Sequence, residues 1–212
     1  MPAEVKICGL TDAESIDAAI EAGAEFIGLV FFAKSPRAVT AEQAAELTQF
    51  IEGVQKVGLF VDPDDALLNE VLTHVRLDLL QFHGSESPER LAEVRQDFGV
   101  PVMKVIPVAE AADLKAAEPF LDVVDYLLFD AKPPKGADLP GGNAVSFDWS
   151  ILKGFKAPVP WMLAGGLTPA NVAEAIKATG APIVDVSSGV ESAPGVKDSD
   201  KIRAFVTAAL SA

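Results

Sequence analysis

The sequence predicts an α/β fold: a single closed (β/α)8 barrel, or TIM barrel, with parallel strands. Eight short apolar runs alternate with longer segments whose apolar residues recur at a helical period. Continuous apolar runs are typical of parallel strands that are covered by helices. The units recur at roughly 25 residues and leave no linker, which favours one closed barrel over an open sheet. Residues 1–212 are therefore expected to form one domain.

Each predicted strand is a short run rich in β-branched and aromatic residues. In chain order the runs are "VKIC", "FIGLVFF", "KVGLFV", "LLQFH", "PVMKVIPV", "YLLFD", "WMLAGG" and "PIVDVSS". Helical segments between them include "DAESIDAAIEAG", "TAEQAAELTQFI", "PDDALLNEVLTH", "PERLAEVRQDF" and "TPANVAEAIKATG". Thr168 is a predicted N-cap with Pro169 in the first turn, and Gly23 and Gly180 are predicted helix ends. The Gly- and Pro-rich segment 131–146 predicts a long strand-to-helix loop.

Composition restricts the possible partners of the chain. Its 212 residues are half hydrophobic and carry a net charge of -14, which argues against binding to nucleic acid or anionic lipid. No apolar run approaches the roughly 20 residues of a membrane span, and no signal peptide is visible. One cysteine cannot form an internal disulfide and is compatible with a reducing compartment. We expect a cytoplasmic monomer or homodimer.

Polar residues gather where the predicted strands end. The C-terminal ends of the strands form the face of a (β/α)8 barrel that carries its chemistry. The residues at or just beyond these ends are Cys8, Ser35, Arg37, Asp62, His83, Asp130, Gly165, Gly166, Ser187 and Ser188. The sequence therefore predicts an active site at this face.

Two small-residue loops, "LAGGL" and "VDVSSGVE", end the seventh and eighth runs. Glycine lets backbone N–H groups approach an anion closely, and barrels bind phosphate at this place. We therefore expect the loops to bind a phosphorylated small molecule. The alternative is that the glycines only form tight turns.

Arg37 and His83 are candidate substrate contacts. Arg37 follows the second run, and its planar guanidinium suits a ligand carboxylate; the alternative is an ordinary surface arginine. His83 ends the fourth run and is either a substrate contact or a hydrogen-bonded core residue. The other histidine, His74, falls inside a helix, so metal-ligand spacing is absent and no metal site is expected. "SSG" lacks a nucleophile elbow, which argues against a serine hydrolase.

Cys8 and Asp130 end the first and sixth runs and can supply the two proton transfers of a sugar isomerisation. An inert buried thiol is the alternative for a lone cysteine. Strand alternation places Lys6 on the same interior face as Cys8, roughly 6–7 Å deeper. Our hypothesis is that Lys6, balanced by Asp185 on the neighbouring eighth strand, supplies positive potential beneath the thiol. The alternative is a purely structural ion pair.

Together these motifs resemble phosphoribosylanthranilate isomerase, a family of tryptophan biosynthesis. The matching stretches are "VKICGLT", "GLVFFAKSPRAVT", "KVGLFVD", "LLQFHGSE", "LLFD", "GGNAVSFDW", "LAGGLTPANV" and "VDVSSGVESAPGVKD". They span nearly the whole chain. "KICG", "SPR" and "VDVSSGVE" in this order are highly specific, although each alone is a weak indication.

The resemblance implies an Amadori rearrangement of N-(5-phosphoribosyl)anthranilate to 1-(2-carboxyphenylamino)-1-deoxyribulose 5-phosphate. It implies that Asp130 donates a proton to the furanose oxygen and that Cys8 then removes the C2 proton, without a metal or organic cofactor. Arg37 corresponds to the contact with the anthranilate carboxylate. The remaining expected substrate-binding residues are His83, Asp185 and the phosphate-site residues Gly165, Gly166, Ser188 and Gly189.

One loop departs from the family pattern. After the sixth strand the family usually has Gly-Gly-Thr-Gly, whereas this chain has Gly141, Gly142, Asn143 and Ala144. We expect this change to alter substrate binding or product release rather than the chemistry.

Two other functions remain open from the residues. One is another phosphosugar barrel enzyme, resembling indole-glycerol-phosphate synthase or ribulose-phosphate epimerase. The first would need a lysine acid at a strand end and the second metal-binding histidines, and neither pattern stands out. The other is a non-catalytic barrel that binds a phosphorylated ligand, which would not need both Cys8 and Asp130.

Overall fold

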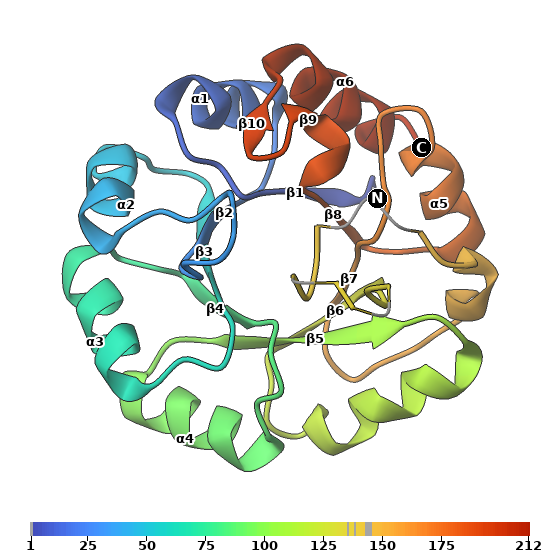
Figure 1. Cartoon of the computed structure of the whole chain (residues 1–212). Helices are drawn as coiled ribbons and strands as arrows, with labels where there is room; N and C mark the ends of the chain where they lie inside the picture. The colour runs from blue at the N-terminus through green and yellow to red at the C-terminus, as the bar shows by residue number, and fades with distance from the viewer. Residues whose placement is uncertain (1, 135, 138, 143–145) are drawn as a thin grey trace.

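The computed structural model describes residues 2–134, 136, 137, 139–142 and 146–212. Eight parallel strands form a closed barrel in the order β1 to β8, with helices around the outside (Figure 1). β1 pairs with both β2 and β8, which closes the barrel. The predicted (β/α)8 barrel is thus confirmed. The strands are β1 Glu4–Cys8, β2 Phe26–Val30, β3 Gln55–Phe60, β4 Leu79–Phe82, β5 Val102–Val108, β6 Tyr126–Ala131, β7 Trp161–Leu163 and β8 Ile183–Val186.

The helices follow the strands and cover the barrel. They are α1 Ala13–Ala22, α2 Ala41–Thr48, α3 Asp65–His74, α4 Pro88–Phe98, α5 Val172–Thr179 and α6 Ser199–Leu210, with the 3-10 helices η1 Ala111–Phe120, η2 Trp149–Leu152 and η3 Ser188–Val190. A small antiparallel hairpin of β9 (Glu191–Ala193) and β10 (Val196–Lys197) lies between η3 and α6. The sequence did not predict this hairpin.

The ends of two helices match the predicted glycines, and the start of one helix does not. Gly23 (φ 99°) and Gly180 (φ 72°) cap α1 and α5 in the left-handed conformation, as predicted. The prediction of Thr168 as an N-cap is wrong, because α5 begins at Val172 after Asn171. Asn171 Oδ1 accepts the Thr168 N–H at 2.7 Å. This bond closes a turn ahead of the helix.

Two apolar clusters separate the inside of the barrel from the helix layer. The larger one packs the outer faces of the strands, including Ile7, against the helices. The smaller one fills the barrel with Phe26, Val57, Leu79, Met103, Val105, Leu128, Met162, Ala164 and Ile183. Lys6 pairs with Phe26 in register, and alternation along β1 then directs both Lys6 and Cys8 inward.

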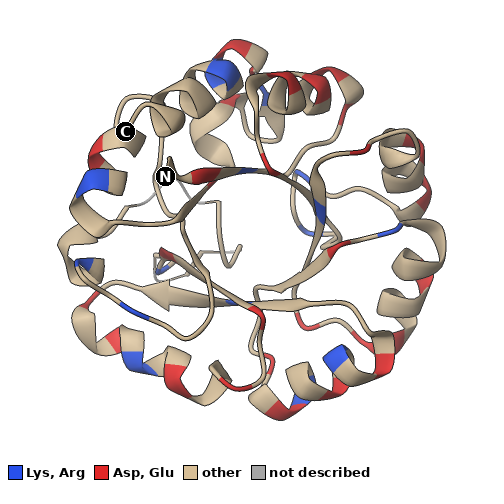
Figure 2. Cartoon of the chain, turned by 180° about the vertical axis from the view of Figure 1, so that it is seen from behind, with Lys and Arg blue, Asp and Glu red and all other residues tan. Residues whose placement is uncertain are grey.

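Charged residues lie mainly on the outer layer. Figure 2 shows many acidic and basic residues on the surrounding helices and fewer on the strands and loops of the barrel. In the part of the chain that the structure describes, no helix has the length and apolar character needed to cross a membrane.

Candidate functional site

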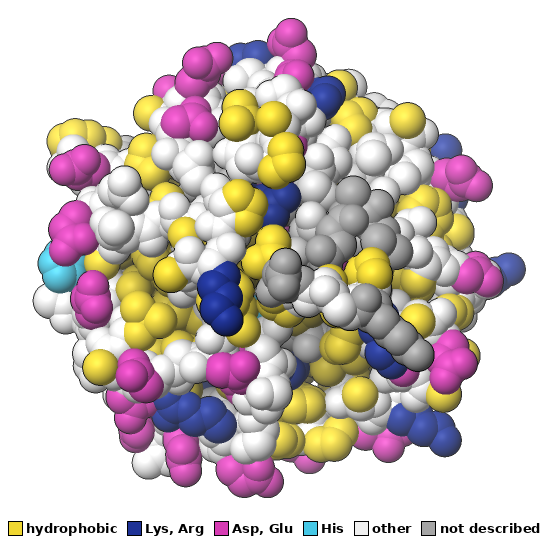
Figure 3. Space-filling view, in the orientation of Figure 1, with side chains coloured by type: hydrophobic (Ala, Val, Ile, Leu, Met, Phe, Trp, Pro, Cys, Tyr) yellow, Lys and Arg dark blue, Asp and Glu magenta, His cyan; other side chains and the backbone are white. Residues whose placement is uncertain are grey.

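A pocket opens at the C-terminal ends of the strands. In the view of Figure 3, acidic side chains lie mostly towards the outer edge and hydrophobic ones are frequent nearer the centre. Every predicted site residue lines this pocket: Cys8, Arg37, His83, Asp130, Gly165, Gly166, Asp185, Ser188 and Gly189. Ser35 and Ser187 line it as well, but Asp62 does not. Barrel closure therefore brings together residues that lie in or just after six different strands.

Cys8 is buried at the end of β1, with an exposed fraction of 4%. Gly28 on β2 leaves room for it, since a Cβ there would lie 2.8 Å from Sγ. Beneath it, Lys6 Nζ bonds to Asp185 Oδ1 at 2.8 Å. Burial raises the pKa of the Cys8 thiol; Lys6 lowers this pKa, Asp185 raises it, and the net shift is upward. The positive potential of Lys6 thus opposes burial without outweighing it.

Asp130 lies near the end of β6 and has an exposed fraction of 9%. Its Oδ1 accepts the N–H of Ala131 at 2.8 Å, and its Oδ2 lies 3.4 Å from His83 Nε2. The following loop passes closely over this pair, because a Cβ on Gly141 would lie 2.9 Å from Asp130 Oδ2. The carboxyl group is therefore held between a histidine and a loop that limits access of water.

Arg37 is buried rather than on the surface, with an exposed fraction of 6%. Its Nε and Nη2 donate to Glu191 Oε1 and Oε2 at 2.7 and 2.9 Å, a two-point contact that the sequence did not predict. Nη1 has no hydrogen-bond partner among the described residues. A Cβ on Gly142 would lie 2.7 Å from this nitrogen. The guanidinium therefore lines the pocket with one edge occupied and another open.

The two glycine loops pack too closely for side chains. Gly165 (φ 88°) and Gly166 (φ 67°) are left-handed, and a Cβ on Gly165 would lie 2.6 Å from the Ala131 nitrogen. A Cβ on Gly189 would collide with the Leu167 carbonyl oxygen. These contacts fit the tight-turn alternative. Among the described residues, however, the N–H groups of Gly165 and Gly166 donate to no protein acceptor, so they are also available to an anion.

Three residues near the pocket received no role from the sequence. Glu191 and Lys197 belong to the motif "VDVSSGVESAPGVKD" and bond to each other at 2.8 Å. Gln81 lines the pocket from β4, and its Oε1 is buried without a hydrogen-bond partner among the described residues. A single amide within the apolar run "LLQFH" could have indicated Gln81. No local pattern indicates that Glu191 meets Arg37.

The fold and the pocket together define a (β/α)8-barrel protein with a polar site at the barrel's C-terminal face. The family model for N-(5'-phosphoribosyl)anthranilate (PRA) isomerase matches residues 5–208. The chain belongs to the PRA isomerase family.

Relatives and solved structures agree with this assignment. N-(5'-phosphoribosyl)anthranilate isomerase of Paramagnetospirillum magneticum is 70% identical over 210 residues, which cover 99% of this chain and 98% of the relative. The Rhodospirillum rubrum enzyme of the same name is 59% identical and covers 96% of each chain. The crystal structure of phosphoribosyl anthranilate isomerase from Thermotoga maritima superimposes with a TM-score of 0.87 at 33% identity, covering 99% of this chain and 100% of that one.

A further structure of this family contains a ligand. It is phosphoribosyl anthranilate isomerase in complex with reduced 1-(o-carboxyphenylamino)-1-deoxyribulose 5-phosphate, with a TM-score of 0.84, 32% identity and coverage of 99% and 100%. The matches confirm the predicted family and, with it, an isomerase of tryptophan biosynthesis. The loop departure at Asn143 and Ala144 lies outside the described residues.

Proposed function

We propose that the pocket at the barrel mouth carries out the Amadori rearrangement with Asp130 as the acid and Cys8 as the base. The observation that carries the proposal is that both residues line one pocket, together with Arg37. The alternative of a non-catalytic barrel would not need this pairing. The proposed substrate is N-(5'-phosphoribosyl)anthranilate, a phosphorylated small molecule.

In the first step, protonated Asp130 donates its proton to the furanose ring oxygen. The C1–O bond breaks, and the nitrogen lone pair forms an iminium at C1. The limited exposure of Asp130 supports this role, because a carboxyl group shielded from water transfers its proton more selectively to the substrate. His83, 3.4 Å from Oδ2, is positioned to orient the carboxyl group and to contact the sugar.

In the second step, the Cys8 thiolate removes the proton from C2, which the iminium has made acidic. The electron pair of the C–H bond forms the enolamine, which then tautomerises to the ketone. The raised pKa of Cys8 makes the thiolate a minor species at neutral pH but a stronger base once formed. One proton is donated and one is removed, so the two side chains suffice without a metal or an organic cofactor.

The remaining residues bind the two ends of the substrate in this proposal. The open edge of Arg37 contacts the anthranilate carboxylate, and Asp185 lies near the sugar. Phosphate is held by backbone N–H groups of Gly165, Gly166, Ser188 and Gly189. The ligand of the related crystal structure carries both a carboxyphenyl group and a phosphate, which supports two anion sites in a pocket of this kind.

We also propose the domain organisation, location and oligomeric state of the protein. We take residues 1–212 as one domain, since both apolar clusters belong to the barrel. Because of its net charge of -14, the protein is proposed to bind neither nucleic acid nor anionic membrane. It is also proposed to be cytoplasmic. It is proposed to be a monomer or homodimer; the related Thermotoga maritima enzyme is described as dimeric.

Fluorescence of the anthranilate group, which differs between substrate and product, tests the proposal directly. The Asp130→Asn variant should lower kcat by about 10²- to 10⁴-fold, because the amide cannot donate the proton. Asp62→Asn is the matched control: it makes the same change just after β3, outside the pocket, and should leave kcat unchanged. Absence of turnover by the wild type would refute the function, and full turnover by Asp130→Asn would refute the acid assignment.

A further inference from the structure

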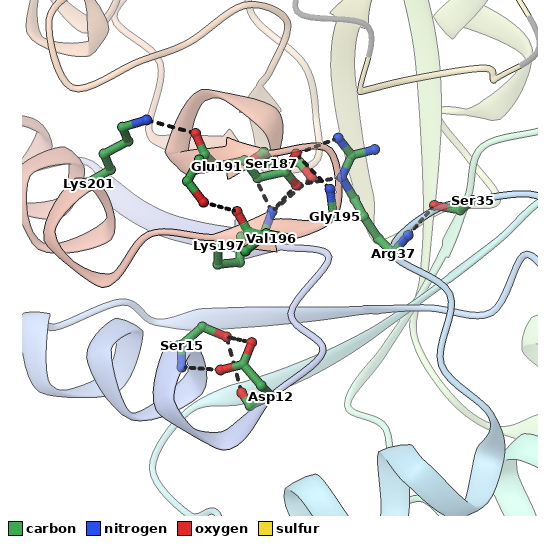
Figure 4. A network of polar contacts seen from close by, with 11 residues as sticks. Asp12, Ser15, Ser35, Arg37, Ser187, Glu191, Gly195, Val196, Lys197 and Lys201 are labelled. Carbon is green, nitrogen blue, oxygen red and sulfur yellow. Dashed lines mark hydrogen bonds and ion pairs between the residues drawn. The ribbon is translucent and has the colours of Figure 1, made fainter.

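Arg37 belongs to a buried network of charges that links the pocket to the β9–β10 hairpin (Figure 4). The side chains of Arg37, Glu191 and Lys197 have exposed fractions of 7%, 4% and 0%. Burying three charges is costly unless each is paired and hydrogen-bonded. These three charged groups therefore form a buried network and not an ordinary surface ion pair.

Glu191 is saturated by donors. Its Oε1 accepts from Arg37 Nε at 2.7 Å and from Lys197 Nζ at 2.8 Å. Its Oε2 accepts from Arg37 Nη2 at 2.9 Å and from the Gly195 N–H at 3.2 Å. Burial alone would raise the pKa of Glu191, but Arg37 and Lys197 hold this pKa below its ordinary value. The carboxylate is thus an ionised, rigid partner for the guanidinium.

The contact occupies one of the two edges by which a guanidinium binds carboxylates. Glu191 takes the edge formed by Nε and Nη2, so the edge formed by Nη1 and Nη2 remains available. Gly142 passes next to Nη1, where a Cβ would lie at 2.7 Å, and both residues line the pocket. The stem of Arg37 packs on Gly9, where a Cβ would lie 2.6 Å from Cδ. The aliphatic part of the Arg37 side chain and its planar guanidinium are therefore both held in place.

Lys197 determines the charge that a ligand meets. Its Nζ also donates to the carbonyl oxygen and hydroxyl of Ser187, at 2.9 and 3.2 Å, so it is fixed behind Ser187, which lines the pocket. Burial lowers the pKa of Lys197 and Glu191 opposes this shift. Because Nζ has three oxygen acceptors, its protonated form is stabilised, and Arg37 and Lys197 then contribute two positive charges and Glu191 one negative charge. The cluster keeps one net positive charge, whereas a bare Arg37–Glu191 pair would be neutral and would attract a ligand carboxylate much less.

We propose that Glu191 is a positioning residue, which orients Arg37 so that its open edge receives the carboxylate of the substrate, with Lys197 restoring the positive charge. The inference rests on the proposed role of Arg37. It assigns a function to the hairpin, which carries both Glu191 and Lys197 to the guanidinium from the far end of the chain.

Two ligands separate positioning from a merely structural role. The first is reduced 1-(o-carboxyphenylamino)-1-deoxyribulose 5-phosphate, and the second is its phenylamino counterpart without the carboxylate. Glu191→Gln should weaken binding of the first by about tenfold or more and leave the second nearly unchanged. Equal weakening of both ligands would show a structural role only. Tighter binding of the first ligand would show that charge, not orientation, dominates; either result overturns the proposal.

Further variants complete the test. Glu191→Asp keeps the charge but shortens the side chain, so it should lose the same selectivity; unchanged selectivity would contradict positioning. In an Arg37→Met background, Glu191→Gln should cause no further loss of selectivity. Asp125→Asn is the matched control, because Asp125 pairs with Arg95 at 2.6 Å outside the pocket, and it should change neither affinity.

The hydrogen bond between Arg37 and Glu191 can also be followed in the wild-type protein, without any variant. By NMR of the arginine side chain, the Arg37 Nε–H signal should persist when the carboxylated ligand binds, while the Nη signals shift. Loss of the Nε–H bond on binding would mean that the ligand displaces Glu191, against the proposal. A wild type that binds neither ligand and has no turnover would instead refute the proposed function itself, which keeps the two failures distinct.

Discussion

Lys6 and Asp185 form an ion pair inside the barrel, with Nζ and Oδ1 2.8 Å apart and Lys6 fully buried. They are register partners on β1 and β8, the two strands that close the barrel. The pair lies one interior position below Cys8; the positive charge of Lys6 lowers the pKa of the thiol, and the negative charge of Asp185 raises it. One contact therefore serves both as a structural ion pair and as the source of positive potential beneath the thiol.

Replacing Lys6 with methionine should raise the pKa of Cys8 further, because Lys6 lowers it while Asp185 raises it. The rate of iodoacetamide alkylation against pH measures this pKa. The unpaired Asp185 should cost about 3–5 kcal/mol of unfolding free energy. Lys6→Met/Asp185→Asn removes both charges and should show a smaller rise. An unchanged thiol pKa in Lys6→Met would leave the pair with a structural role alone.

The pH profile should reflect the raised pKa of Cys8. The value of kcat/KM should increase with pH above neutrality, as the thiolate fraction grows, and Cys8→Ser should lose this limb. Stability should change in the opposite direction. The folded-state pKa of Cys8 lies above its ordinary value of 9.0. The contribution of the thiol to the free energy of unfolding is therefore fully present below pH 9.0 and is lost as pH rises through the folded-state pKa. Thermal unfolding of wild type and Cys8→Ala should therefore converge at alkaline pH; a constant difference would contradict the shift.

Gly142→Ala should impair substrate binding through Arg37. The new Cβ would lie 2.7 Å from Nη1, which must move away from its open position. We expect KM to rise several-fold with a smaller change in kcat, measured by the fluorescence assay. Gly136→Ala is the control, because Gly136 is also left-handed (φ 82°) but a Cβ there meets nothing within 4 Å. Equal effects of the two variants would point to backbone strain instead.

Gln81→Met should leave stability unchanged or raise it by about 1 kcal/mol. Its Oε1 is buried without a partner among the described residues, so its removal loses no bond and relieves a desolvation cost. Because Gln81 lines the pocket, ligand affinity should fall. Thermal melting and titration with the reduced product analogue measure the two effects. A clear loss of melting temperature would indicate that the amide already contributes to the fold.

The strands and most helices could be predicted because their determinants are local. Apolar runs, helical periodicity and glycines such as Gly23 are properties of neighbouring residues. The start of α5 could not be predicted from Thr168, because the side chain of Asn171 stabilises a turn that competes with the helix. The β9–β10 hairpin was missed because its strands have three and two residues, too few to show a period.

The barrel, the face that carries the site and the residue types available there all follow from the order of residues along the chain. This is because the position of a residue at the end of a strand decides whether it reaches the barrel mouth once the barrel closes. The pairings between side chains, by contrast, arise from the folded structure. Arg37 meets Glu191 across 154 positions and Lys6 meets Asp185 across 179. Such contacts, and the burial that raises the pKa of Cys8, depend on distances that exist only after closure of the barrel.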